Sequence, residues 1–173
     1  MIESLQQSIR DVPDFPTKGI LFKDITTLLK DPVLFGNAVK AMRDAVEGRK
    51  IDVVASIEAR GFIFGSALAY LLGAGFVPIR KPGKLPAKTV MEKYELEYGT
   101  DQVEMHADAI RPGQQVLLVD DLLATGGTAL AACKLIEQLG GKVEVVLFLI
   151  ELAFLKGRKL LNKYELVSII TYN

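Results

Sequence analysis

Short apolar runs recur along the chain, each bounded by polar or glycine-rich sequence. They are rich in valine, isoleucine and leucine, as strands that are buried on both faces of a parallel sheet usually are. They span residues 51–57, 76–79, 116–119 and 143–150, with a further candidate at 165–172. Stretches with helical periodicity separate them, and strand–helix–strand units of this length predict a parallel sheet. We therefore expect an α/β fold with a twisted, mainly parallel sheet and helices on both faces.

Helices are predicted before and between these strands. Asp31-Pro32 is a typical helix start, with Asp at the N-cap and Pro at the first helical position. GFIFGSALAYLLG (61–73) and TALAACKLIEQLGG (128–141) predict two more helices. At the N-terminus, apolar residues recur at spacings of three and four from Ile2 to Val12, which predicts a short amphipathic helix over that stretch.

One long segment, residues 80–109, interrupts this alternation. It begins with the basic run RKPGKLPAK and continues as EKYELEYGTDQVEMH, in which apolar and acidic residues alternate. Gly99-Thr100-Asp101 supplies the expected turn, so the segment predicts a two-stranded ribbon on a basic arm. A long insertion in a compact α/β domain is usually functional. We therefore expect a flexible lid here.

Composition limits the classes of function. The 173 residues carry 21 basic and 21 acidic side chains, without the basic excess of a general nucleic-acid binder. A single cysteine, Cys133, and a single histidine, His106, exclude a disulfide framework and Cys/His zinc sites. No targeting signal or convincing membrane span is predicted. We expect one domain over residues 1–173, cytoplasmic, that binds neither nucleic acid nor membrane.

The most informative motif is VLLVDDLLATGGTALAACKL, residues 116–135. A buried strand leads to Asp120 and Asp121, and a loop containing Thr125-Gly126-Gly127-Thr128 leads into a helix. N–H groups at a helix N-terminus attract anions, and glycines let the main chain approach a phosphate closely. Ionised carboxylates only accept hydrogen bonds, so they suit hydroxyl groups. A ribose 5-phosphate fits both parts of the motif, whereas Walker and GxGxxG dinucleotide loops do not match it.

This motif resembles the signature of type I phosphoribosyltransferases, and within them the chain is most similar to the adenine-specific members. The resemblance covers nearly the whole length through DFPTKGILFKDITTLLKDP, IEARGFIFG, FVPIRKPGKLP and YELEYG, in the family's order and spacing. It implies the type I phosphoribosyltransferase fold, with a base-binding N-terminal hood over residues 1–35 and the ribbon as lid. It also implies the reaction of adenine with 5-phosphoribosyl 1-pyrophosphate to give AMP and pyrophosphate, in purine salvage.

The resemblance further implies which residues hold the phosphates. The loop residues Ala124, Thr125, Gly126, Gly127 and Thr128 would hold the 5′-phosphate. Asp120 and Asp121 would lie near the ribose hydroxyls and the hydration shell of Mg²⁺, the implied cofactor, which would bind mainly through substrate oxygens. Pyrophosphate would be bound by the turn after the first strand and by the basic arm, that is by Glu58, Ala59, Arg60, Arg80, Lys81, Lys84 and Lys88.

Two features of this pyrophosphate set stay open in the sequence. In the family the peptide between Glu58 and Ala59 is often cis. Relatives are homodimers in which the basic arm of one subunit approaches the site of the other, so Arg80 is a candidate for a contact in trans. Arg60 would also act in catalysis, because a guanidinium fork can stabilise the leaving pyrophosphate.

Adenine would be recognised mainly through main-chain groups of the hood. The implied contacts are the Leu21 carbonyl and the Lys23 amide, with Phe22 and Leu122 as apolar walls. Relatives commonly carry Arg at the position of Lys23. A main-chain contact survives that change, whereas a side-chain role does not follow.

The acid/base group would lie in the ribbon. Glu97 in ELEYG would manage the proton at purine N7 or N9, with Tyr98 beside it as a lid residue. Glu95 and Glu97 share one face of an alternating strand, so spacing alone does not choose between them. The family match selects Glu97.

Two other functions are compatible with parts of this sequence pattern. A regulator that senses phosphoribosyl pyrophosphate would keep the phosphate loop, but the first 50 residues lack a basic helix-turn-helix pattern. A transferase for hypoxanthine, xanthine or uracil is disfavoured by the ELEYG and FKDIT segments.

Overall fold

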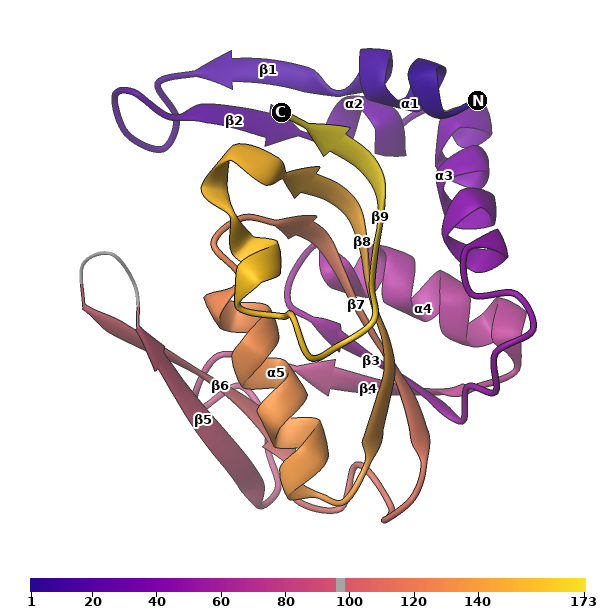
Figure 1. Ribbon diagram of the computed structural model, residues 1–173, viewed down its shortest axis with the longest axis vertical. Helices are drawn as coiled ribbons and strands as arrows, with labels where there is room; N and C mark the ends of the chain where they lie inside the picture. Colours follow the sequence, from indigo (N-terminus) through magenta and orange to yellow (C-terminus); the bar gives the residue numbers. More distant parts are fainter. Residues whose placement is uncertain (96–98) are drawn as a thin grey trace.

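The computed structural model describes residues 1–95 and 99–173. In this part of the chain the centre of the fold is a five-stranded sheet in the order β4-β3-β7-β8-β9, and every neighbouring pair is parallel (Figure 1). The prediction of a parallel α/β sheet is confirmed. The strands are β3 (Val53–Ile57), β4 (Gly75–Ile79), β7 (Gln115–Leu123), β8 (Lys142–Leu152) and β9 (Leu166–Tyr172).

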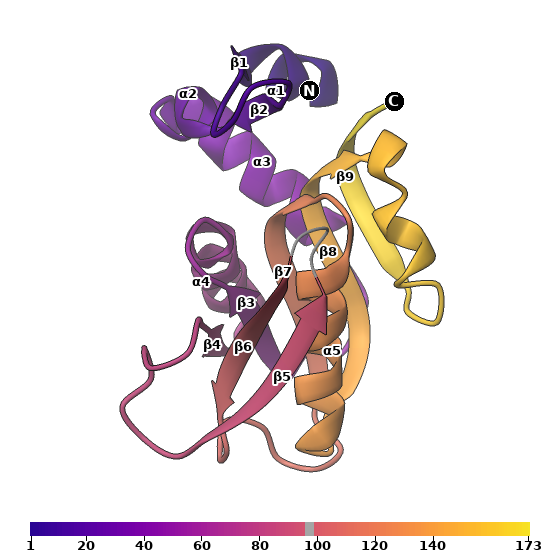
Figure 2. The ribbon, with the colours of Figure 1, turned by 90° about the vertical axis from the view of Figure 1, so that its left-hand side faces the viewer.

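Helices cover both faces of this sheet, as predicted. One face is covered by α3 (Pro32–Asp44) and α4 (Gly61–Leu72), and the other by α5 (Gly127–Gln138) (Figures 1 and 2). Successive residues of β7 alternate between the two cores, because side chains along a strand point to opposite faces. Leu117 is buried in the core beneath α4, whereas Leu118 is buried in the core beneath α5.

The N-terminal segment forms a separate small layer, the hood (residues 1–30). Helix α1 (Ile2–Ser8) is followed by an antiparallel pair, β1 (Arg10–Pro13) and β2 (Leu21–Asp24), and by the short helix α2 (Thr26–Leu29). The prediction of a helix continuing to Val12 is therefore wrong at its end. Val12 pairs with Phe22 in the hairpin, because the apolar segment around Phe22 offers it a strand partner. The hood lies across the carboxyl ends of the sheet strands (Figures 1 and 2).

The predicted ribbon is present as β5 (Thr89–Glu95) paired antiparallel with β6 (Thr100–His106). It lies along α5, and its residues Val103 and Met105 are buried in the core beneath that helix (Figure 2). The base of the ribbon is thus part of the packed structure. Thr100 and Asp101, expected in the turn, belong to β6 and pair with β5.

Candidate active site

Two neighbouring acids lie near the carboxyl end of β7. The strand was predicted to end at Val119, but it continues through Asp120 and Asp121 to Leu123, because β8 provides a pairing partner along this whole length. Asp121 is buried and Asp120 is half-buried, and the Asp121 N–H donates to Asp120 Oδ1 at 2.8 Å. Burial raises the pKa of both carboxyls, and the neighbouring Asp121 charge raises the pKa of Asp120 further. The pair therefore favours ligands that donate hydrogen bonds or carry positive charge.

Arg60 provides the nearest positive charge to this acid pair. It directly precedes α4, after a cis peptide between Glu58 and Ala59. Its Nε lies 2.8 Å from Asp121 Oδ2, and its charge opposes the effect of burial on the Asp121 pKa. Its guanidinium carbon also lies 5.0 Å from the centroid of the Phe22 ring in the hood. Arg60 therefore connects the acids of the sheet with the hood.

The start of α4 approaches the acids closely because residue 61 is glycine. A Cβ at Gly61 would lie 2.7 Å from Asp120 Oδ1 and 3.1 Å from Ser56 Oγ. Any other residue would displace the Asp120 carboxylate or the helix. Gly61 stands in the matching segment IEARGFIFG, but its close approach to Asp120 depends on the fold and carries no local sequence signal.

The proposed phosphate loop leads from β7 into α5. Gly126 has a φ of +88°, a left-handed conformation that favours glycine, and α5 begins at Gly127. Among residues 1–95 and 99–173, no side chain caps the first turn, so its N–H groups are available to an anion. Thr125 is exposed, whereas Thr128 is half-buried in the first turn. The geometry of an anion-binding helix start is present at the predicted residues.

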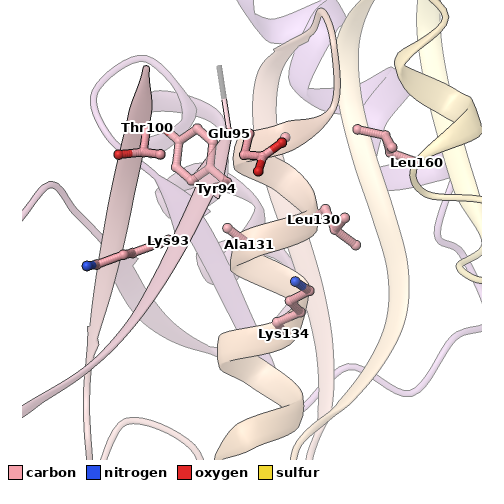
Figure 3. Close-up of a pocket in the computed structure, with 9 residues that line it drawn as sticks. Lys93, Tyr94, Glu95, Thr100, Leu130, Ala131, Lys134 and Leu160 are labelled. Atoms are coloured by element: carbon pink, nitrogen blue, oxygen red, sulfur yellow. The ribbon is translucent and has the colours of Figure 1, made fainter. Parts of the chain in front are cut away.

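The ribbon lies directly over this helix start. A Cβ at Gly127 would lie 3.3 Å from Tyr94 Cδ2 and 3.4 Å from the Glu95 carbonyl oxygen. Between the ribbon and α5 is a pocket of about 490 Å³, in which Tyr94 and Glu95 of β5 face the first turns of the helix (Figure 3). The pocket is lined by Lys93, Tyr94, Glu95, Thr100, Gly127, Leu130, Ala131, Lys134 and Leu160. Glu97 and Tyr98 lie outside the described residues.

The first part of the basic arm is held by Glu58. Arg80 Nη2 donates to Glu58 Oε2 at 3.0 Å, and the Lys81 N–H donates to the same carboxylate. Burial would raise the Glu58 pKa, but these two donors outweigh it and lower the pKa. Lys81 Nζ turns toward the ribbon, where it contacts Asp101 and donates to the Tyr94 hydroxyl at 3.0 Å.

The remaining cations of the arm are solvent-facing. Lys84 and Lys88 are exposed, and the Lys84 carbonyl accepts a bond of 3.3 Å from Arg80. The structure thus brings Glu58, Arg80 and Lys81 together, while Arg60 pairs with Asp121 of the acid pair.

A second pocket, of about 410 Å³, lies between the hood and Arg60. It is lined by Val12, Phe15, Phe22, Asp24, Thr26 and Arg60. The Phe15 and Phe22 rings meet edge to face at 5.1 Å between centroids. Neither Val12 nor Phe15 was singled out from the sequence, although both stand beside or within the matching DFPTKGILFKD segment.

Leu21 and Lys23 are on this hood strand but are not among the residues that line the pocket. Lys23 is buried on the opposite face, where Nζ donates to Asp11 Oδ1 at 2.6 Å and lies 3.9 Å from the Tyr172 ring centroid. The expected main-chain contacts of Leu21 and Lys23 with a base therefore stay a prediction. Leu122 is half-buried against the core beneath α4 and is not among the residues that line the pocket.

The carboxylates near Arg60 are suited to contact the water shell of a metal ion rather than to ligate the ion directly. Among residues 1–95 and 99–173, no three His, Cys, Asp or Glu side chains are grouped closely enough to hold a metal. Asp121 Oδ2 is buried and ion-paired with Arg60 Nε at 2.8 Å, but no donor in the described residues meets it with hydrogen-bond geometry. A carboxylate oxygen of this kind can accept from a metal-bound water or a sugar hydroxyl. Within the same residues, no helix has both the length and the apolar character needed to cross a membrane.

Comparison with known proteins agrees with this geometry. Residues 25–171 match the phosphoribosyl transferase domain family. The adenine phosphoribosyltransferase of Thermoanaerobacter sp. (strain X514) is 57% identical over 171 residues, which are 99% of each chain.

Solved structures give the same result. The crystal structure of adenine phosphoribosyltransferase from Thermoanaerobacter pseudethanolicus is similar with a TM-score of 0.98 at 56% identity, over 99% of this chain and 100% of that one. The Saccharomyces cerevisiae enzyme, complexed with an imino-altritol bisphosphate and adenine, has a TM-score of 0.91 at 42% identity, over 97% of each chain. The resemblance found in the motifs is confirmed, and the chain belongs to the adenine phosphoribosyltransferases within the phosphoribosyl transferase domain family.

Proposed function

We propose that this chain transfers the phosphoribosyl group of 5-phosphoribosyl 1-pyrophosphate to adenine, giving AMP and pyrophosphate in purine salvage. The observation that carries the proposal is the position of Arg60, within 2.8 Å of Asp121 and 5.0 Å from the Phe22 ring centroid. Arg60 lies between two parts of the site. On one side are the acid pair and the anion-binding loop, which suit a ribose phosphate, and on the other is an apolar pocket, which suits a flat base. The membership in the family supports the same reaction.

The sugar phosphate is held by groups at the carboxyl edge of the sheet. The N–H groups at residues 124–128 bind the 5′-phosphate, and Asp120 and Asp121 accept hydrogen bonds from the ribose hydroxyls. Ribose C1 then lies between the acid pair and the hood pocket. This arrangement aligns adenine N9 with C1, and alignment alone can supply a large part of the rate enhancement.

The chemical step is displacement of pyrophosphate at C1 by N9, with inversion. The bond to pyrophosphate breaks early, so positive charge develops on the ribose as in glycoside hydrolysis. Arg60 and the arm residues Arg80, Lys81 and Lys84 stabilise the negative charge on the leaving pyrophosphate. Glu97 accepts the proton that adenine loses from N7 or N9.

Mg²⁺ is part of the proposal. It would be bound mainly by substrate oxygens, with Asp120 and Asp121 contacting its waters, and would neutralise charge on the diphosphate. Asp121 Oδ2, which pairs with Arg60 but accepts no hydrogen bond of good geometry from the described residues, supports this assignment.

Base recognition relies on the hood. Phe22 and Phe15 provide apolar contact, and the Arg60 guanidinium lies against the Phe22 ring. The Leu21 carbonyl and the Lys23 N–H contact the 6-amino group and N1, which distinguishes adenine from 6-oxo purines. Leu122 does not line this pocket and is given no part in base recognition.

We also propose a homodimer in the cytoplasm. Large apolar side chains are exposed on α4 and the edge strand β4, notably Tyr70 at 86%, Leu71 at 48% and Phe76 at 37%. A second copy would cover this face, which adjoins Arg80 and so would bring the arm near the partner's site. The single cysteine, Cys133, is a buried free thiol, as expected in a reducing compartment. Sedimentation velocity tests the dimer, and a monomer at micromolar concentration would exclude it.

A turnover assay with matched bases tests the reaction. With 5-phosphoribosyl 1-pyrophosphate and Mg²⁺, adenine should be converted to AMP, while hypoxanthine and guanine should be poorer by roughly 10⁴-fold, because a site built to pair a polar group rejects its mismatch. Product identity is checked by chromatography, and reactions without Mg²⁺ serve as controls. Equal rates for hypoxanthine would refute the adenine assignment.

A further inference from the structure

The turn that joins β8 to β9 lies against the phosphate loop. A Cβ at Gly157 would meet the Ala124 carbonyl oxygen and would lie 3.0 Å from both the Gly126 nitrogen and the Thr125 carbonyl carbon. In the opposite direction, a Cβ at Gly126 would lie 2.6 Å from the Gly157 carbonyl oxygen. The two backbones are therefore in direct contact, with no room for a side chain from either.

Backbone conformation does not explain the glycine at 157. Gly126 has a positive φ, and so does the neighbouring Lys156 at +58°, but Gly157 does not. An L-residue could adopt the conformation of residue 157. The glycine is explained by its close approach to the phosphate loop.

Arg158 fixes this turn to the sheet. Its Nε and Nη2 donate to the two oxygens of buried Glu151 at 3.0 and 2.5 Å, and its Nη1 donates to the Leu166 carbonyl at 3.1 Å. Ser168 Oγ donates to the same carboxylate at 2.6 Å. One guanidinium thus ties the turn to the end of β8 and to β9, and a planar, bidentate contact of this kind is directionally specific.

Figure 1 shows the result in three dimensions. The segment between β8 and β9 passes beside the start of α5, on the side of the phosphate loop away from the ribbon. The loop is bounded by β5 residues at Gly127 and by Gly157 at Gly126. Other parts of the chain therefore pack on two sides of the residues that present N–H groups to the phosphate.

We propose that Gly157 and Arg158 are positioning residues for the 5′-phosphate: Gly157 sets the position of the loop at residues 124–126, and Arg158 holds Gly157 in place. The inference rests on the proposed function, because it takes the loop as the phosphate site. A methyl group at 157 requires the two backbones to separate by roughly 1 Å to restore an ordinary contact. The loop N–H groups move with that separation.

The test compares Gly157→Ala with Gly36→Ala. Gly36 lies in α3, where an added Cβ meets nothing within 4 Å, so this control adds the same methyl group in open space. For Gly157→Ala, the KM for phosphoribosyl pyrophosphate and the calorimetric Kd for AMP should rise by roughly tenfold or more, since misplacement by about 1 Å can cost ~10²-fold. The KM for adenine should stay near that of the wild type, and so should the values for Gly36→Ala.

Arg158→Lys tests the same inference while residue 157 stays glycine. It keeps a positive charge near Glu151 but loses the fork, so it should shift the same two constants in the same direction and by less. The inference is overturned if Gly157→Ala behaves like Gly36→Ala, if the constants for adenine and for the phosphate-bearing ligands change equally, or if folded Arg158→Lys leaves the KM for phosphoribosyl pyrophosphate unchanged. A wild-type protein that neither binds AMP nor converts adenine would instead refute the proposed function.

Discussion

The Lys23 side chain fastens the hood to the end of the sheet, and its removal should cost stability without changing base selectivity. The chosen change is Lys23→Met, because Met retains an unbranched apolar side chain that can pack where the Lys stem packs. It removes the contact with Asp11 at 2.6 Å and the contact with the Tyr172 ring at 3.9 Å. The main chain of residue 23, which the proposal assigns to base recognition, is left in place.

The two lost contacts differ in value. The Asp11 side chain is 53% exposed, so it stays hydrated after the change and the lost ion pair costs at most about 1 kcal/mol. The Lys23 side chain is only 9% exposed, so its contact with the Tyr172 ring is desolvated and contributes ~0.5–2 kcal/mol. The cation–π contact should therefore dominate, and Lys23→Met should lower the free energy of unfolding by about 1–2 kcal/mol.

Urea unfolding followed by circular dichroism measures this change. A double-mutant cycle of Lys23→Met with Tyr172→Leu should show a coupling energy between the two positions. Tyr172→Phe keeps the ring face, so this variant should retain the stabilisation from the cation–π contact. The ratio of kcat/KM for adenine and hypoxanthine is measured in parallel and should not change. A lowered ratio at unchanged stability would mean that the Lys23 side chain reaches the base, and additive effects of Lys23 and Tyr172 would refute the cation–π argument.

Three further predictions concern the phosphate loop, the ribbon and the end of β8. Gly127→Val should weaken binding of AMP and phosphoribosyl pyrophosphate in calorimetry while the fold persists, because its side chain enters the space beside Tyr94; unchanged affinity would move the phosphate site elsewhere. Glu97→Gln should lower kcat by roughly 10²–10⁴-fold, whereas the control Glu95→Gln should stay near wild type. A large loss of kcat in Glu95→Gln instead would reverse the assignment. Arg158 lowers the Glu151 pKa, so the ionised Glu151 stabilises the fold at pH above the ordinary Glu pKa, and this stabilisation is lost as pH falls through the lowered pKa. The Tm of Glu151→Gln, measured against pH, should therefore fall less steeply in acid than that of the wild type.

The sheet and its main helices could be predicted because each carries a strong local pattern. The run at 51–57 became β3, Asp31 accepts from the Val33 and Leu34 N–H groups as an N-cap, and Gly73 ends α4 at a φ of +64°. These signals depend on residues close in sequence. The phosphate loop belongs to the same class, because strand, glycines and helix are contiguous.

Other features depend on residues far apart in the sequence. Val12 continues a helical spacing, but its pairing with Phe22 across the hood hairpin decides its conformation. The apolar run at 116–119 did not show that β7 extends to Leu123, since that extension depends on β8. Gly157 gave no signal at all, because its close neighbours are some thirty residues away in the chain and meet it only in the fold.

The ion pair of Arg60 and Asp121 has a consequence for how ligands exchange at this site. Any anion that binds the guanidinium competes with a carboxylate that the protein itself supplies, so the measured affinity is a difference between two ion pairs. Added salt screens the internal pair as well as the incoming one, and the ionic-strength dependence of binding at Arg60 is therefore shallower than its charge alone would give. When the bound anion leaves, the Asp121 carboxylate replaces it at the guanidinium, which favours product release after each turnover.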